Sequence, residues 1–261
     1  MSVSTAQDEI NGALYQRADL VRLYTAVQLH PPEAVALVRY REDIQGRRVL
    51  DLGCGAGRLA TYLRPLTNHY AGLDVSAHMV AHSRQRFPGL TFVQGDMRHL
   101  PFEAGAFDAV LAVFNLFDAV SHDDRLKVLA DVRRVLAPGG LLFFSAHNRN
   151  YAEADLVPRL HFSRNPITQL RLVGDYLRCV VNHRRIRKLQ QACGEYALVN
   201  DEGHHFSALH YYIRRDAQAR QLKTAGFELI ECLDELGRTL RPEEDDRAYS
   251  CIHYLARSQG S

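Results

Sequence analysis

The sequence predicts an α/β fold with a doubly wound, mostly parallel sheet, and three observations support this class. Apolar runs and helical patterns alternate along much of the chain, as expected of parallel strands joined by crossover helices. The apolar runs are short and do not alternate with polar residues, which is typical of strands buried on both faces. The stretch VLDLGCGAGRLA at residues 49–60 indicates a buried strand that turns into a helix over a ligand.

The composition is that of an ordinary globular protein. The 261 residues suffice for one large α/β domain with an insertion, and a net charge of +2 gives no global attraction to nucleic acid or membranes. The five cysteines are scattered and form no C-x-x-C pair, which argues against a disulfide framework and fits a reducing compartment. No secretory pattern opens the chain and no apolar stretch nears the ~20 residues of a membrane span, so we expect a cytoplasmic protein.

The elements follow from periodicity and from turn residues. A helical region is expected from Asp8 to Leu37, broken at Pro31 and Pro32. Five strands are then predicted, at Arg48–Leu52, Tyr70–Asp74, Leu90–Gln94, Phe107–Val113 and Leu141–Ser145. The helices between them are predicted at Arg58–Leu66, Ala77–Arg86 and Arg125–Leu136.

The alternation stops near Asn150 and resumes near Asp216. Between these points we expect a basic helix and then a hairpin of Glu195–Asn200 and His205–Ile213. After a helix at Asp216–Ala225, the last two strands, Phe227–Leu233 and Ser250–Ala256, could form a hairpin that adds one antiparallel strand. The predicted organisation is therefore an N-terminal helical cap, a ligand-binding core, a helix-plus-hairpin insertion that covers the cleft, and the completion of the sheet, at 1–45, 46–150, 151–213 and 214–261.

The glycine-rich turn does not match the common phosphate-binding patterns. A dinucleotide fingerprint that begins at Gly53 and Gly55 requires a third glycine where Arg58 stands, and the Gly-Lys-Ser/Thr ending of a P-loop is absent. Asp51 places a negative charge beside the turn. This charge disfavours a pyrophosphate and suits a ligand that carries an ammonium group.

With these residues in view, the chain resembles the class I S-adenosylmethionine-dependent methyltransferases, a family with a Rossmann-like fold. The resemblance spans about residues 45–148 and rests on five motifs in the family's order and spacing. They are Asp51-Leu52-Gly53-Cys54-Gly55-Ala56-Gly57, Gly72-Leu73-Asp74-Val75-Ser76, Gln94-Gly95-Asp96-Met97, Phe107-Asp108-Ala109-Val110 and Arg134-Val135-Leu136-Ala137-Pro138-Gly139-Gly140.

The resemblance implies S-adenosyl-L-methionine as the cofactor. Asp74 ends the second strand, where a carboxylate can accept both hydroxyls of a ribose; its alternative role, a helix cap, can be filled by Ser76. The resemblance places Asp96 at the adenine amino group, with a turn cap as the alternative. The complete set of expected cofactor residues is Asp51, Gly53, Cys54, Gly55, Gly57, Asp74, Val75, Met79, Asp96, Met97, Asn115, Leu116, Tyr15 and Tyr24, of which the two tyrosines are equally compatible with core packing.

The candidates for the acceptor side are His147, Asn148 and Tyr211. His147 and Asn148 follow the fifth strand at its carboxyl end, where a histidine could act as a base, or could bind the loop that begins the insertion. In the predicted hairpin His210 and Tyr212 face one way and Tyr211 the other, and we expect Tyr211 to line the pocket. No histidine spacing supports a metal site, so none is expected.

Residues 159–188 carry eight basic side chains against one acid, Asp175, beside an apolar stripe of Leu170, Val173, Leu177 and Val181. Three interpretations remain open: a lid that selects an anionic small molecule, a surface for RNA phosphates, or a solvated basic face. Because no RNA-binding module is recognisable, we expect transfer of a methyl group by in-line displacement to an N or O atom of a small-molecule acceptor. RNA methylation, or cofactor binding without turnover, is the alternative. We expect no membrane partner, and a monomer or homodimer.

Overall fold

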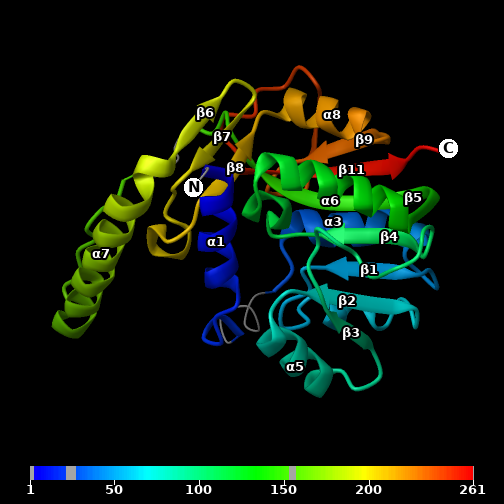
Figure 1. Cartoon of the computed structure of the whole chain (residues 1–261), viewed down its shortest axis with the longest axis horizontal. Helices are drawn as coiled ribbons and strands as arrows, with labels where there is room; N and C mark the ends of the chain where they lie inside the picture. The colour runs from blue at the N-terminus through cyan, green and yellow to red at the C-terminus, as the bar shows by residue number, and fades with distance from the viewer. Residues whose placement is uncertain (1–2, 22–27, 153–156, 261) are drawn as a thin grey trace.

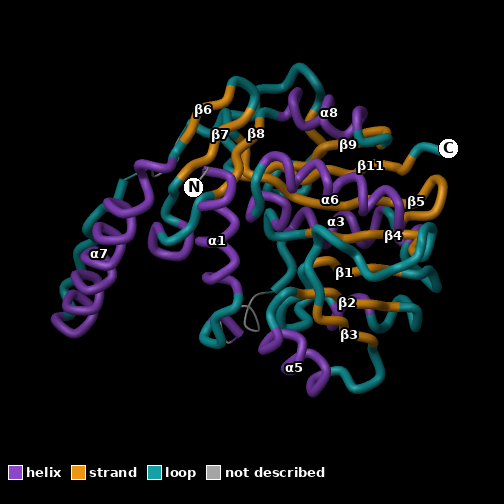
Figure 2. Tube along the Cα trace, in the orientation of Figure 1, coloured by secondary structure: helices purple, strands orange, loops and turns teal. Residues whose placement is uncertain are grey.

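The computed structural model describes residues 3–21, 28–152 and 157–260, and their strands form one mixed sheet. Its parallel half has the order β3-β2-β1-β4-β5. These strands are β1 (Val49–Leu52), β2 (Tyr70–Asp74), β3 (Thr91–Gln94), β4 (Phe107–Ala112) and β5 (Leu136–Asn148). The predicted doubly wound, mostly parallel sheet is confirmed (Figures 1 and 2).

Beyond β5 the sheet continues with antiparallel pairs. The strand β11 (Cys251–Ser258) lies between β5 and β9 (Phe227–Leu233) and is antiparallel to both. The hairpin predicted for the last two strands is therefore present. The short strand β10 (Thr239–Leu240) adds a further antiparallel pair at the edge, next to β9, which the sequence analysis did not expect.

The predicted late hairpin is present and joins the same sheet. The strand β7 (Tyr196–Val199) pairs antiparallel with β6 (Gln191–Cys193) and with β8 (His210–Ile213). In turn β8 lies parallel to the end of β5, with His147 opposite Tyr212. The insertion thus extends the sheet where β5 ends, and the predicted domain limits at 45, 150 and 213 remain predictions.

Helices cover both faces of the sheet. The described α-helices of the chain are α1 (Val3–Tyr15), α3 (Pro31–Arg39), α4 (Ala60–Leu63), α5 (Ala77–Arg86), α6 (His122–Val135), α7 (Pro166–Ile186) and α8 (Arg215–Thr224). The helix predicted at Arg58–Leu66 is shorter than expected, because the glycine turn runs up to Leu59. Serine side chains cap α5 and α6: Ser76 accepts from the Met79 amide and Ser121 from the Asp124 amide.

Two apolar clusters fill the layers on either side of the sheet. Leu50 and Leu52 of β1 pack in the cluster that contains Val128 and Val132 of α6, and Val49 packs in the cluster that contains Leu63 of α4. Successive strand residues point to opposite faces, so the apolar residues of β1 supply both cores. By contrast, α7 extends away from the sheet, on the same side as α1 (Figure 1). Within the described ranges, no helix is both long and apolar enough to cross a membrane.

One arginine is fully buried in the layer between α6 and α8. Arg125 donates to the Asp118 carboxylate at 2.5 Å, and to the side chains of Gln218 at 2.6 Å and Gln221 at 3.0 Å. Its guanidinium also lies 4.7 Å from the centre of the Tyr211 ring. A buried charge is tolerated only when it is paired and hydrogen-bonded, and these contacts meet that condition.

We therefore expect Arg125→Met to lower the free energy of unfolding by about 3–5 kcal/mol, because it leaves the Asp118 carboxylate buried without its guanidinium. The measurement is urea unfolding followed by circular dichroism. Lys127→Met on the same helix is the matched control, since its ammonium is exposed and pairs with Asp124 at 2.7 Å; it should change the free energy by no more than about 1 kcal/mol. Equal effects of the two substitutions would contradict the assignment.

Candidate cofactor and acceptor site

The glycine turn after β1 has a backbone that side chains would disrupt. Gly53 has a φ of 68°, and a Cβ atom there would lie 2.5 Å from the Leu116 side chain. Gly57 has a φ of 77°, and its Cβ would lie 2.7 Å from the Phe87 ring. Both positions thus need glycine for conformation and for close approach. The turn brings backbone amides to the carboxyl end of the sheet, where α/β proteins bind ligands.

Asp74 at the end of β2 holds this turn in place. One carboxylate oxygen accepts the Gly55 amide and the other the Ser76 amide, each at 2.8 Å. Burial raises the pKa of Asp74, while these two hydrogen bonds act to lower it. Asp74 also lines the cavity beside the turn, and each carboxylate oxygen can accept a further hydrogen bond.

Asp51 of β1 is a second buried acid at the same cavity. It accepts the Tyr70 hydroxyl at 2.8 Å, and burial raises its pKa to about 7. The nearby Arg58 is engaged elsewhere, since its guanidinium binds the Glu33 carboxylate at 2.6 and 2.7 Å. An uncompensated carboxylate of this kind favours a ligand that brings its own positive charge.

One cavity collects most of the residues that the sequence assigned to the cofactor. It lies between α1, the glycine turn and the ends of β2, β3 and β4. The predicted residues that line it are Tyr15, Asp51, Gly53, Cys54, Gly55, Asp74, Val75, Met79, Asp96, Met97 and Leu116. Sequence reasoning missed its other contributors from α1 and the loop after β4, among them Asp8, Asn11, Gly12, Phe114 and Val120.

Among the described residues, two of those predicted to bind the cofactor, Gly57 and Asn115, do not line the cavity. Gly57 shapes the turn from behind, against Phe87. The Asn115 amide is directed toward the acceptor side, where it lies 3.1 Å from His147 Nε2 and 3.0 Å from Cys251 Sγ. Tyr24 lies outside the described residues.

Asp96 lines the cavity, and its carboxylate also accepts hydrogen bonds from Arg98. The Arg98 backbone amide donates to its carboxylate at 2.9 Å, and the guanidinium does so at 2.6–3.0 Å. Burial raises the pKa of Asp96, but these hydrogen bonds outweigh it and the pKa is lowered. Asp96 is therefore an ionised acceptor whose position is fixed by its neighbour, and its adenine role remains a prediction.

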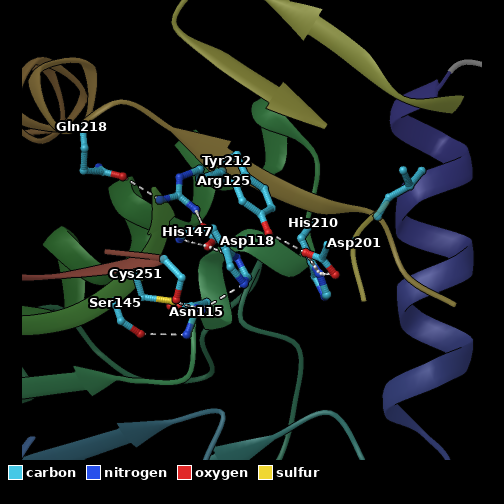
Figure 3. Close-up of polar contacts among 12 residues, drawn as sticks. Asn115, Asp118, Arg125, Ser145, His147, Asp201, His210, Tyr212, Gln218 and Cys251 are labelled. Carbon is cyan, nitrogen blue, oxygen red and sulfur yellow. Dashed lines mark hydrogen bonds and ion pairs between the residues drawn. The ribbon is translucent and has the colours of Figure 1, made fainter. Parts of the chain in front are cut away.

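His147 on β5 is held by a buried carboxylate. Its Nδ1 lies 2.8 Å and its backbone amide 2.7 Å from one oxygen of Asp118, whose other oxygen binds Arg125 (Figure 3). This contact fixes a proton on Nδ1 and leaves Nε2 as the acceptor toward Asn115. His147 lies at the strand end predicted for it, and its role as a base remains a prediction.

A second carboxylate–imidazole pair lies against the first. His210 Nδ1 is 2.9 and 3.0 Å from the two oxygens of Asp201, which also accepts the Tyr212 hydroxyl at 2.8 Å (Figure 3). The rings of His210 and His147 stack with centres 5.1 Å apart. His210 Nε2 lies 3.5 Å from the Tyr15 hydroxyl, so this pair reaches the wall of the cofactor cavity. Burial acts to lower the pKa of His210, but the Asp201 charge outweighs it and the pKa is raised.

Two of the predicted acceptor-side residues are buried in contacts away from the described cavity. Tyr211 is fully buried on the opposite face of β8, where its hydroxyl lies 2.7 Å from His122 Nδ1. Tyr211 therefore does not line the described cavity, whereas His210 and Tyr212 on the other face of the strand stack against His147. A role for Tyr211 at the acceptor remains a prediction. Asn148 is also buried, and its amide donates to the carbonyls of Asp246 and Tyr249 at 2.7 and 3.0 Å, which is a structural role.

The two imidazoles and Asp201 bring potential metal-ligand atoms within 4.8 Å of one another. Each imidazole already has its Nδ1 at a carboxylate, an arrangement that orients a base equally well. The expected absence of a metal remains a prediction.

Comparison with known proteins gives a consistent result for the first half of the chain. The family described as "Methyltransferase domain" matches residues 49–140. The chain is 37% identical over 153 residues to the fatty-acid O-methyltransferase of Mycolicibacterium smegmatis, covering 56% of this chain and 51% of that protein. It is 40% identical over 107 residues to phthiotriol/phenolphthiotriol dimycocerosates methyltransferase 1 of Mycobacterium ulcerans, covering 40% and 38%. The chain thus matches about half of the first relative's length, and less of the second.

Solved structures share the fold over nearly the whole chain. A S-adenosylmethionine-dependent methyltransferase from Clostridium acetobutylicum aligns with a TM-score of 0.63 at 15% identity, covering 91% of this chain and 95% of that one. The 1,6-didemethyltoxoflavin-N1-methyltransferase of Burkholderia thailandensis, with S-adenosylhomocysteine bound, aligns with a TM-score of 0.62 at 15% identity, covering 98% and 89%.

The cavity fits the cofactor of these proteins. Its glycine turn admits a ligand close to the backbone, Asp74 offers acceptors to a ribose, and Asp51 offers a negative charge to an ammonium group. Residues 49–140 therefore match the methyltransferase domain family, and the chain as a whole shares the fold of S-adenosylmethionine-dependent methyltransferases.

Proposed function

We propose that the chain is a methyltransferase that moves the methyl group of S-adenosylmethionine, by in-line displacement, to an O or N atom of a small-molecule acceptor. The observation that carries this proposal is the pair of acids, Asp51 and Asp74, on neighbouring strand ends of one cavity. The names of the relatives favour an oxygen of a lipid-like molecule. The cofactor, when bound, supplies an activated methyl group with a neutral leaving group.

The chain's own contribution is orientation and proton removal. Alignment of the acceptor atom with the methyl group can supply several kcal/mol, about 7–11 at best. A hydroxyl acceptor must also lose a proton, and the two carboxylate–imidazole pairs supply bases at the end of β5 and β8. We propose that His147 and His210 form this acceptor side, with Asp118 and Asp201 as the residues that position them.

Replacement of Asp74 by Ala should weaken binding of S-adenosylmethionine at least about tenfold, because hydrogen bonds to a charged acceptor are worth about 1.5–3 kcal/mol. Titration calorimetry with S-adenosylmethionine and with S-adenosylhomocysteine measures it. Asp123→Ala, the loss of an exposed acid in the first turn of α6, is the matched control and should bind normally. Unchanged affinity in Asp74→Ala would remove the ribose assignment.

The affinity for S-adenosylmethionine should fall as the pH is lowered from about 7 to about 5. The pKa of Asp51 is raised to about 7, so below that pH the carboxyl is protonated and loses its attraction for an ammonium group. The loss should approach about tenfold per pH unit below the pKa. Asp51→Asn should bind weakly at every pH and show little of this dependence. An equally steep dependence in Asp51→Asn would assign the titration to another group.

His147→Ala and Asp201→Asn should lower turnover more than they lower cofactor affinity, with a long-chain alcohol as the acceptor tested, because a hydroxyl group must lose a proton to the base. In Asp201→Asn, loss of the negative charge lowers the pKa of His210, so the acid limb of the pH–rate profile should move to lower pH. Because a merely structural role for Asp201 would not move this limb, an unmoved limb would contradict the role of the His210 pair as base.

A further inference from the structure

The helix α7 exposes a row of large aliphatic side chains. Ile167, Leu170, Leu177 and Val181 have exposed fractions between 56% and 82%. Their spacing of three, seven and four residues places them on one face of the helix. Phe162, which is 83% exposed, lies near the start of the same helix, because the adjacent Ser163 amide donates to the Gln169 side chain at 2.7 Å. We call Ile167, Leu170, Leu177, Val181 and Phe162 the α7 apolar stripe.

Arginines line one flank of this stripe. Arg171 and Arg178 directly follow Leu170 and Leu177, so they lie about 100° around the helix from those side chains. Arg185 continues the row one heptad later, and all three are exposed. The single acid of the helix, Asp175, lies 4.0 Å from Arg171 at the surface. The face is thus both apolar and strongly basic.

The opposite end and face of α7 attach it to the acceptor side of the molecule. The buried His183 binds the Asn200 side chain at 2.8 Å, and Asn182 donates to the His205 carbonyl at 2.9 Å. His205 belongs to the short helix η4 (Gly203–Phe206), whose His204 ring lies edge-on against Tyr15 of the cavity wall at 5.5 Å. The N-terminal part of α7 extends outward from this attachment (Figure 1).

Three kinds of partner could cover such a face, and the charges distinguish them. In a pair of α7 helices from two copies of the chain, the flanking arginines would face a helix whose single acid, Asp175, already pairs with Arg171. An RNA surface matches the arginines but leaves the aliphatic stripe in water. An anionic lipid surface satisfies both parts, since acyl chains accept the aliphatic side chains and headgroups attract the arginines.

We propose that α7 docks the protein, through the α7 apolar stripe and its arginines, on the surface of a membrane that contains anionic lipids. The helix lies along the surface and does not span it. This proposal departs from the sequence-based expectation of no membrane partner, which considered net charge and spanning segments only. It brings the acceptor side, to which α7 is attached, close to a lipid phase, and it stands independently of the proposed methyl transfer.

The experiment is flotation of the full chain with vesicles of phosphatidylcholine alone, or of phosphatidylcholine with about 30 mol% phosphatidylglycerol. Wild type should bind the mixed vesicles at least about tenfold more tightly than the neutral ones, and salt should weaken this binding. The pair Leu170→Gln and Leu177→Gln should lose at least about tenfold in affinity for the mixed vesicles. The pair Arg171→Gln and Arg178→Gln should lose the preference for anionic lipid.

Val38→Gln with Leu236→Gln is the matched control, because both side chains are exposed aliphatics remote in sequence from α7; it should bind like wild type. Calorimetry should give every variant the wild-type affinity for S-adenosylmethionine, so loss of vesicle binding cannot be confused with failure of the proposed function. Absence of wild-type binding to mixed vesicles would overturn the proposal. So would a dimer that the leucine pair abolishes, or binding to bulk tRNA that the arginine pair abolishes and the leucine pair leaves intact.

Discussion

The region proposed as the acceptor side depends on one buried carboxylate. Asp118 follows β4 and accepts hydrogen bonds from Arg125 of α6 through one oxygen, and from the backbone and ring of His147 through the other. Arg125 extends the network to Gln218 and Gln221 of α8. A buried charge must be paired and hydrogen-bonded. The positions of α6, α8 and the end of β5 are therefore constrained by all of these hydrogen bonds together.

The regular half of the sheet could be predicted because its signals are local. Val49–Leu52 and Phe107–Ala112 are short, mostly apolar runs that each contain one aspartate, and they become parallel neighbours in the sheet. The glycine turn could also be predicted. At Gly53 the backbone has a positive φ and a Cβ atom would clash with the Leu116 side chain, so the position requires glycine. A backbone requirement of this kind determines the residue type at that position, so it can be recognised in the sequence.

The acceptor side could not be predicted in the same way, because it depends on pairings between distant segments. The two-residue period of β8 was visible, but only the register with β5, which sets Tyr212 opposite His147, decides which face meets the cleft. The sequence therefore singled out Tyr211, whereas His210 and Tyr212 stack against His147. The stripe on α7 was also visible, but amphipathicity does not reveal what covers an apolar face. The structure leaves most of that stripe exposed.

Polar contacts from the N-terminal helix α1 also join segments that are distant in the sequence. Asn11 of α1 donates to the carbonyls of Ala119 and Leu209, both at 2.7 Å, and accepts the Leu209 amide at 3.1 Å. One side chain thus ties the cavity wall both to the loop after β4 and to the residue that precedes β8. Since Tyr15 on the same helix contacts His210, the placement of α1 sets the distance between the cofactor cavity and the buried imidazoles. The cofactor turn is determined within a short stretch of chain, whereas the acceptor side exists only when α1, the end of β5 and the insertion are assembled together.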